Sequence, residues 1–252
     1  MIELIEPFII FSNTSTIMIW LWLMVFYDNP QSTLRATYLL MSVIIINVWL
    51  KALFHISLPY ASSTFAFPSG HMHASTAVYG YLAYCSKSYI QKIPLAAIIL
   101  AIGLAEIQLG YHNTLDILGG FAFAALHITT YHASISAYSE RLVMVYLFIL
   151  CTFVVILHAH ETPYILSCWG VMLAQTLAAL LPINQPKRSS LLNKTLGLLG
   201  SALVGSCCYL IYLTYMPMPP SFETLFYTAV VLSCIYLPLG LTHSINSYQE
   251  KS

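Results

Sequence analysis

The sequence predicts an all-α membrane protein, a polytopic bundle of about nine transmembrane helices. Of its 252 residues, 59% are hydrophobic and only 7% are charged, whereas soluble domains carry roughly 25% charged residues. So few charges do not cover a water-facing surface. The formal net charge is zero, and nucleic-acid binding requires a basic face. We therefore predict the membrane bilayer as a partner and no nucleic acid.

Nine segments of the chain are apolar and close to the length of about 20 residues that a membrane-crossing helix needs. The connectors between them are short and hold most of the Pro, Asn and charged residues. The third, fourth and fifth segments are also rich in Ala, Gly and Ser, which favours close helix packing. The nine predicted spans are 7–27, 36–56, 71–87, 93–111, 114–137, 142–158, 163–183, 195–215 and 223–243.

The basic residues predict how these spans are oriented. Eight of the nine Lys and Arg residues follow an odd-numbered span or lie in the C-terminal tail, and only Lys51 lies near the opposite end of the second span. Connectors rich in Lys and Arg stay on the cytoplasmic side of a membrane. The connectors without Lys or Arg should therefore face the non-cytoplasmic (periplasmic or extracellular) side, and they are 57–70, 112–113, 159–162 and 216–222.

The first of two polar motifs lies in residues 67–73, Phe-Pro-Ser-Gly-His-Met-His, where an outward connector enters the third span. Pro68 and Gly70 favour a tight loop, Ser69 can cap the helix that follows, and His71 falls in its first turn. The free backbone amides of such a helix start favour an anionic group such as phosphate.

The second polar motif joins the fourth and fifth spans on the same predicted side. His112 and Asp116 are four residues apart, so on a helix they share one face. Asp116 can then hold one imidazole nitrogen and leave the other free as a nucleophile or base. Ionisable groups at membrane depth are costly and usually functional. Two histidine loops, a carboxylate and Lys51 at one depth therefore predict a functional site.

Together these motifs resemble the type-2 phosphatidic acid phosphatase superfamily. The pattern of that family is Lys-x6-Arg-Pro, then Pro-Ser-Gly-His, then Ser-Arg-x5-His-x3-Asp. Lys51 and Pro59 match the first motif, residues 68–71 match the second in full, and His112 and Asp116 match the third.

The resemblance implies a two-step phosphoryl transfer that needs neither a metal nor another cofactor, on a lipid or polyprenyl phosphate. His112 would attack phosphorus to form a phosphohistidine, and Asp116 would orient it. His71 would protonate the leaving oxygen and then activate water or another acceptor. The groups that would hold the phosphate oxygens are Lys51 and the backbone amides around Ser69 and Gly70.

The resemblance covers residues 35–137. It predicts a phosphatase-like transmembrane core at 1–141 that carries the site, followed by additional transmembrane helices at 142–252. It also implies that the site opens toward the non-cytoplasmic face, where lipid head groups are within reach.

Three positions of the family pattern are replaced in this chain, and two of them are the arginines that would hold the phosphate. Leu58 stands at the arginine of the first motif, and Ala105 and Glu106 stand at the Ser-Arg pair of the third. Arginine binds phosphate bidentately, and leucine does not bind it. Because an attraction or repulsion at 4 Å is worth up to about 4 kcal/mol at an effective dielectric of 20, exchanging a charged arginine for a charged glutamate costs on the order of 8 kcal/mol as an upper bound.

Three interpretations of Glu106 remain open. In the first, Glu106 pairs with Lys51, is protonated or meets a cationic head group, and the enzyme acts on a phosphodiester lipid as a head-group transferase or phospholipase-C-like enzyme. Sphingomyelin synthases are similar in using two histidines and an aspartate without the arginine clamp. In the second, Glu106 binds a divalent metal together with some of His55, His73, His112, His158, His160 and Glu161. In the third, the protein is a catalytically inactive lipid-binding or scaffolding protein.

Overall fold

The computed structural model describes residues 6–27, 30–58, 61–180 and 228. The regular secondary structure of this part of the chain is helical apart from one short hairpin. The predicted all-α class is therefore confirmed for the described chain. The hairpin pairs β1 (Ser57–Leu58) with β2 (Ala61–Phe65) in antiparallel fashion. The helices in chain order are η1 (Glu6–Ser12), α2 (Thr14–Tyr27), α3 (Pro30–Phe54), α4 (Gly70–Ser75), η2 (Thr76–Gly80), α5 (Tyr81–Cys85), α6 (Tyr89–Gln108), α7 (Thr114–Ala137), α8 (Glu140–His158) and α9 (Tyr164–Leu180).

The first seven predicted spans coincide with these helices, with two differences in detail. The segment predicted as 7–27 is a 3-10 helix, η1, followed by α2, and the segment predicted as 71–87 runs through α4, the π-helical η2 and α5. The spans predicted at 195–215 and 223–243 lie outside the described residues. Within the described chain, α3 from Gln31, α6 and α8 are long and apolar enough to cross a membrane, judged by length and composition.

Side-chain caps define where several of these helices begin. Ser69 caps α4, and Asn113 and Asp116 form a capping box at the start of α7. Ser139 caps α8 by accepting a hydrogen bond from the backbone N–H of Leu142 at 3.4 Å. Such caps satisfy backbone N–H groups that have no partner within the helix. The polar residues between the apolar runs therefore fix the helix starts.

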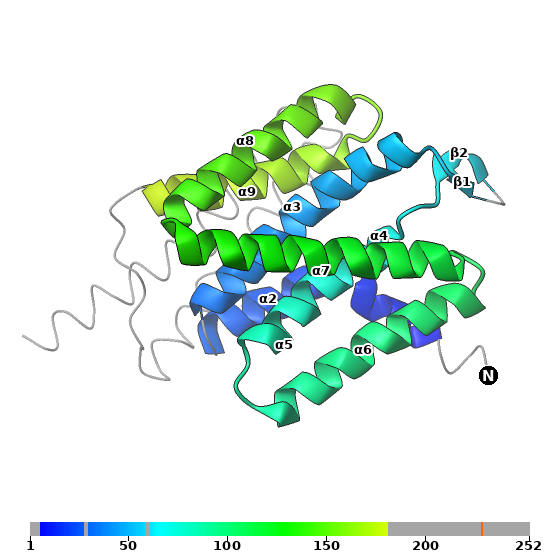
Figure 1. Cartoon of the computed structure of the whole chain (residues 1–252), viewed down its shortest axis with the longest axis horizontal. Helices are drawn as coiled ribbons and strands as arrows, with labels where there is room; N and C mark the ends of the chain where they lie inside the picture. The colour runs from blue at the N-terminus through cyan, green and yellow to red at the C-terminus, as the bar shows by residue number, and fades with distance from the viewer. Residues whose placement is uncertain (1–5, 28–29, 59–60, 181–227, 229–252) are drawn as a thin grey trace, which may run out of the picture.

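Helix α3 is the centre of the bundle. It packs against α2, α8 and α9, and also against the helix formed by α4, η2 and α5. Helix α7 packs against α4 and η2, and it crosses in front of this last helix in Figure 1. The buried side chains at these contacts are mainly Leu, Ile, Val, Met and Tyr. Close packing of apolar side chains around α3 therefore holds the helices together.

Polar contacts also join α3 to the two helices that follow the proposed core. The guanidinium of Arg35 donates two hydrogen bonds of 2.6 Å to the carboxylate of Glu140 at the start of α8. The hydroxyl of Tyr38 donates to the carbonyl oxygen of Met144 at 2.7 Å and contacts the hydroxyl of Thr176 in α9 at 3.1 Å. A bidentate arginine–carboxylate pair is strong and directional. These contacts fix α8 and α9 against α3.

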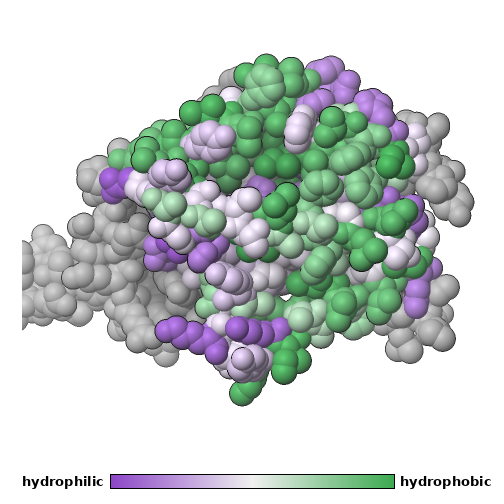
Figure 2. Space-filling view, in the orientation of Figure 1, coloured by the Kyte–Doolittle hydropathy of each residue, from purple (hydrophilic) through white to green (hydrophobic). Residues whose placement is uncertain are grey.

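Large hydrophobic side chains remain exposed on the outer helices. Ile93 and Leu100 on α6, and Tyr146, Phe153 and Ile156 on α8, are each at least 60% exposed. Figure 2 shows that hydrophobic residues predominate on this face of the molecule. Contiguous apolar surface of this kind marks contact with a membrane or with a partner protein. The surface is thus compatible with a membrane protein.

Three of the four connectors that lack Lys and Arg, and that were predicted to share one side of the membrane, lie at one end of the bundle. The hairpin in 57–70, the α6–α7 loop and the α8–α9 loop appear together on one side of Figure 1. Residues from all three, including Phe65, His112 and Glu161, line the same pocket. The predicted connector 216–222 lies outside the described residues.

Close packing at Gly120 generates the first prediction. A Cβ atom added to Gly120 would lie 2.8 Å from the carbonyl oxygen of Ser69 and 3.0 Å from Cβ of Met72. The first neighbour is a backbone atom and the second is attached directly to the backbone, so neither can move away easily. We therefore expect Gly120→Ala to lower the free energy of unfolding by about 1–3 kcal/mol. Thermal unfolding in detergent, followed by size-exclusion chromatography, measures the effect.

Gly80→Ala is the matched control for this experiment. Gly80 is also a helical glycine, but a Cβ there would lie 3.3 Å from the Cδ1 atom of Ile128, the end of a flexible side chain. We expect Gly80→Ala to lower the unfolding temperature less than Gly120→Ala. Equal unfolding temperatures for the two variants would contradict the close approach of α7 to the residue 69–73 turn.

Candidate functional site

Ser69 joins three elements of the site and is fully buried. Its hydroxyl oxygen accepts from the backbone N–H of Met72 at 3.1 Å and donates to the Oε2 atom of Glu106 at 2.5 Å. Its backbone N–H donates to the carbonyl oxygen of Asp116 at 3.0 Å. The polar groups of Ser69 are therefore engaged within the chain, where they hold α4 against the end of α6 and the start of α7.

His71 lies next to the buried carboxylate of Glu106, a contact that was not predicted from the sequence. Nδ1 of His71 lies 2.9 Å from Oε1 of Glu106, with 48% of the His71 side chain exposed and none of Glu106. Nδ1 of His71 and Oε1 of Glu106 are close enough for an ion pair, but their geometry does not meet that of a hydrogen bond. A carboxylate only accepts hydrogen bonds, so it favours a proton on Nδ1 and leaves Nε2 free. Glu106 thus contacts His71 and Ser69. Lys51, the partner considered for Glu106 from the sequence, instead donates to the carbonyl oxygen of Phe65.

His112 is held in the α6–α7 loop by backbone contacts. Gly110 has a φ of +73°, a left-handed conformation that favours glycine, and it reverses the chain after α6. The backbone N–H groups of Tyr111 and His112 then donate to the carbonyl oxygen of Glu106 at 3.0 and 3.4 Å. Through its side chain and its backbone, Glu106 therefore contacts both histidine segments.

Asp116 has two neighbours at the start of α7. Its Oδ2 atom accepts from the backbone N–H of Asn113 at 3.0 Å, and its own N–H donates to the Asn113 side chain at 2.9 Å. The same Oδ2 lies 3.5 Å from Nδ1 of His112, which is long for a hydrogen bond. Nδ1 of His112 is buried and has no hydrogen-bond partner among the described residues. Asp116 thus caps the helix and acts on His112 mainly through its charge.

Lys51 lies near the end of α3, and its ammonium donates to the carbonyl oxygen of Phe65 in β2 at 2.7 Å. Asn47, one turn earlier on the same helix, contacts Nδ1 of His73 at 3.1 Å and donates to the carbonyl of Pro68 at 3.5 Å. Asn47 was missed from the sequence, although its i,i+4 spacing from Lys51 places both on one helix face. That spacing is the signal that could have identified it.

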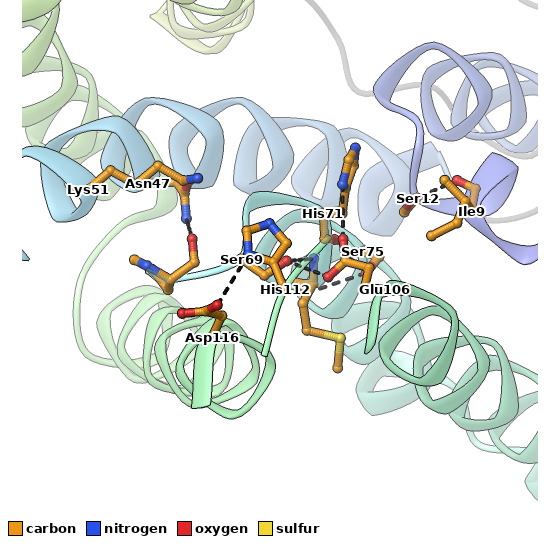
Figure 3. Close-up of polar contacts among 12 residues, drawn as sticks. Ile9, Ser12, Asn47, Lys51, Ser69, His71, Ser75, Glu106, His112 and Asp116 are labelled. Atoms are coloured by element: carbon orange, nitrogen blue, oxygen red, sulfur yellow. Dashed lines mark hydrogen bonds and ion pairs between the residues drawn. The ribbon is translucent and has the colours of Figure 1, made fainter. Parts of the chain in front are cut away.

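The described residues enclose a pocket of about 510 Å³ at this end of the bundle. Lys51, His71, His112 and Gly70 all line it. Figure 3 shows the histidines, Ser69, Glu106 and Asp116 gathered beside the helix that carries Asn47 and Lys51. Ser69, Glu106 and Asp116 are buried behind the lining. Leu58, at the arginine position of the family pattern, is the last residue of β1.

The environment of His112 favours the neutral imidazole. Burial lowers the pKa of His112 below its usual value of 6.5, because a charged imidazolium loses solvation. The negative charge of Glu106 opposes this shift, the positive charge of Lys51 adds to it, and Asp116 also opposes it. The imidazole is therefore neutral at physiological pH and carries a free lone pair.

The residues of the metal hypothesis are dispersed in the structure. His73 is buried against Asn47, His55 packs against the ring of Phe65, and His160 lies 3.4 Å from Glu161 in the α8–α9 loop. Among the described residues, no group of three or more His, Cys, Asp or Glu side chains lies close enough to bind a metal ion. The structure therefore offers the metal hypothesis no ligand set within the described chain.

In comparisons with known proteins, no family model, no curated protein and no solved structure matches this chain. The functional interpretation therefore depends on the motifs and on the geometry of the pocket. The central feature of that geometry is a pair of histidines, each beside its own carboxylate.

The contact between His71 and Glu106 generates the second prediction. In Glu106→Gln, the side-chain amide can donate to Nδ1 of His71, so we expect the neutral ring to move its proton from Nδ1 to Nε2. The ¹⁵N chemical shifts of the two ring nitrogens measure this change. Glu161→Gln is the matched control, because Glu161 is exposed and its ion contact is with His160. An unchanged tautomer of His71 in Glu106→Gln would contradict the pairing.

Proposed function

We propose that this chain is a multi-pass membrane enzyme that transfers phosphoryl groups from a lipid or polyprenyl phosphate through a phosphohistidine. The resemblance to the type-2 phosphatidic acid phosphatase superfamily implies this activity. The observation that carries the proposal is that His71, His112 and Lys51 line one pocket, with a buried carboxylate beside each histidine. Two-step transfer requires one nucleophile and one acid/base that reach the same phosphorus atom.

In the first step, the substrate phosphate binds beside Lys51 and Gly70. The neutral imidazole of His112 attacks phosphorus through Nε2, and a nitrogen–phosphorus bond forms as the phosphorus–oxygen bond to the leaving alcohol breaks. The imidazolium of His71 gives its Nε2 proton to the leaving oxygen. Asp116 stabilises the positive charge that develops on His112.

In the second step, the neutral His71 takes a proton from water or from an acceptor hydroxyl. The oxygen of that molecule attacks the phosphohistidine, the nitrogen–phosphorus bond breaks, and His112 returns to its neutral form. Glu106 stabilises the imidazolium of His71 in both steps and holds Nδ1 protonated. Water as acceptor gives a phosphatase, and a lipid hydroxyl gives a phosphotransferase.

A phosphodiester is the second candidate substrate, and Glu106 is the observation that favours it. A buried carboxylate beside His71 repels the second negative charge of a phosphomonoester, and Lys51 is the only Lys or Arg among the described lining residues. A phosphodiester carries one negative charge fewer. The enzyme would then be a head-group transferase or a phospholipase-C-like enzyme.

We infer that the pocket opens on the non-cytoplasmic side of the membrane. The connectors at the pocket end lack Lys and Arg, and Arg35, Lys87 and Arg141 lie in or beside connectors of the opposite set. In this proposal, residues 1–141 form the core that carries both histidines. In the predicted C-terminal part, 142–252, the described α8–α9 loop contributes to the wall of the pocket.

The third prediction tests the nucleophile. We expect His112→Ala to abolish the phosphoenzyme, and His71→Ala to slow turnover by about 10²–10⁴-fold through loss of the acid/base. Purified protein is incubated with a panel of phospholipids and polyprenyl phosphates, and released phosphate or head group and acid-labile phosphoenzyme are measured. His132→Ala is the control, since His132 contacts Tyr84 and does not line the pocket. Equal release by wild type and His112→Ala would remove His112 from the mechanism, and no release by the wild type would favour an inactive lipid-binding or scaffolding protein.

The fourth prediction concerns pH. Because burial lowers the pKa of His112 below 6.5, the nucleophile stays neutral as the pH falls from alkaline values to 6.5 and is protonated only below that value. We therefore expect protonation of His112 to slow phosphoenzyme formation only below pH 6.5. Single-turnover measurements over a pH series test this. An acidic limb with a midpoint above 6.5 that persists in His71→Ala would contradict the assignment.

A further inference from the structure

Part of the pocket wall is formed by the α8–α9 loop, outside the family-like motifs. His158, Glu161, Thr162 and Tyr164 from this loop and its flanks line the pocket together with the two histidines of the proposed site. All four lie outside the segment that resembles a known family. The pocket therefore has a second polar end that the phosphoryl-transfer mechanism does not use.

The α8–α9 loop has a defined conformation. The backbone N–H groups of Glu161 and Thr162 donate to the carbonyl oxygen of His158 at 3.1 and 3.0 Å, and the hydroxyl of Thr162 donates to the same oxygen at 2.9 Å. Three donors on one carbonyl hold the loop in a tight turn after α8. The position of Glu161 at the pocket is thus fixed by the backbone.

Glu161 carries the only carboxylate among the described lining residues. Its side chain is 67% exposed, and its ion contact is with the exposed His160 at 3.4 Å. By contrast, Glu106 and Asp116 are buried behind the lining and engaged with His71, Ser69 and the start of α7. Glu161 is therefore the carboxylate that a ligand in the pocket can reach.

The lining of the pocket has one permanent charge of each sign. Lys51 supplies the positive charge and Glu161 the negative one, and the rings of Phe65 and Tyr164 also line the pocket. Aromatic faces together with a carboxylate bind ammonium groups. A volume of about 510 Å³ lies within the range of small-molecule sites, so it accommodates a head group as well as a phosphate.

We propose that the α8–α9 loop forms a head-group subsite in which Glu161, with Tyr164, binds the ammonium group of a zwitterionic phosphodiester lipid. The proposal rests on the proposed function, which positions the phosphate beside Lys51 and His112. The substrate class is then a phospholipid with a choline or ethanolamine head group. Glu161 is a specificity-determining residue that takes no part in the bond-breaking steps.

Two soluble phosphodiesters that differ in the cation test this subsite. Glycerophosphocholine carries the ammonium group, and glycerophosphoglycerol carries a hydroxyl in its place. We expect Glu161→Gln to weaken the binding of glycerophosphocholine about fivefold, as the loss of an exposed ion pair worth up to about 1 kcal/mol implies, and to leave the binding of glycerophosphoglycerol unchanged. Titration of the purified 252-residue chain in detergent, followed by intrinsic fluorescence, measures both dissociation constants.

His132→Ala is the control, because His132 contacts Tyr84 and does not line the pocket. It should leave both dissociation constants unchanged. Equal weakening of both ligands by Glu161→Gln, no weakening of either, or no binding of glycerophosphocholine to the wild type would each overturn the subsite.

Turnover of phosphatidylcholine and phosphatidylglycerol vesicles separates this proposal from the catalytic one. Glu161-dependent binding of glycerophosphocholine without any His112-dependent turnover would support the subsite and refute the enzyme. Turnover that depends on His112 but falls equally on both lipids in Glu161→Gln would refute the subsite and leave the enzyme. If both proposals hold, Glu161→Gln lowers turnover of phosphatidylcholine selectively.

Discussion

The buried carboxylate of Glu106 is the interaction on which the arrangement of the site depends. An ionisable group with no exposure needs hydrogen-bonding or charged partners, because burial without them costs several kcal/mol. Here one oxygen accepts from Ser69 and the other faces His71, while the backbone carbonyl of the same residue accepts from the loop that carries His112. The side chain of Glu106 therefore joins α6 to the first histidine motif, and its backbone carbonyl joins α6 to the loop that carries the second.

The two histidines differ in ways that support different roles in the proposed mechanism. The His112 side chain is only 10% exposed and its pKa is lowered by burial, so it carries a free lone pair. His71 is about half exposed and lies against the carboxylate of Glu106, so its ring is accessible to solvent. A buried neutral imidazole suits a nucleophile, and an accessible imidazole with a carboxylate partner suits an acid/base.

The position of the Glu106 side chain changes the energetic cost expected from replacing the family arginine by glutamate. The upper bound of about 8 kcal/mol assumed that the glutamate faces the phosphate directly. In the structure, the carboxylate lies behind the pocket lining and its charge faces Ser69 and His71. Part of the penalty is therefore offset by these partners, and the remaining negative field disfavours a doubly charged phosphate. The exposed carboxylate of Glu161 in the pocket lining is consistent with a ligand that carries a cation as well as a phosphate.

The sequence by itself determined the apolar helices and the two histidine motifs, because hydrophobic length, caps and i,i+4 spacing are local properties. The all-α class, seven helix positions and the capping residue Ser69 follow from such signals. The contacts of Glu106 with Ser69 and His71 do not follow from local signals, because these residues are brought together only by the packing of α6 against α4. The α8–α9 loop reaches the pocket for a similar reason, since the contacts of α8 and α9 with α3 join segments more than 100 residues apart. Tertiary packing alone decided which carboxylate faces which histidine, because side-chain partners across helices depend on interhelical geometry that no local pattern encodes.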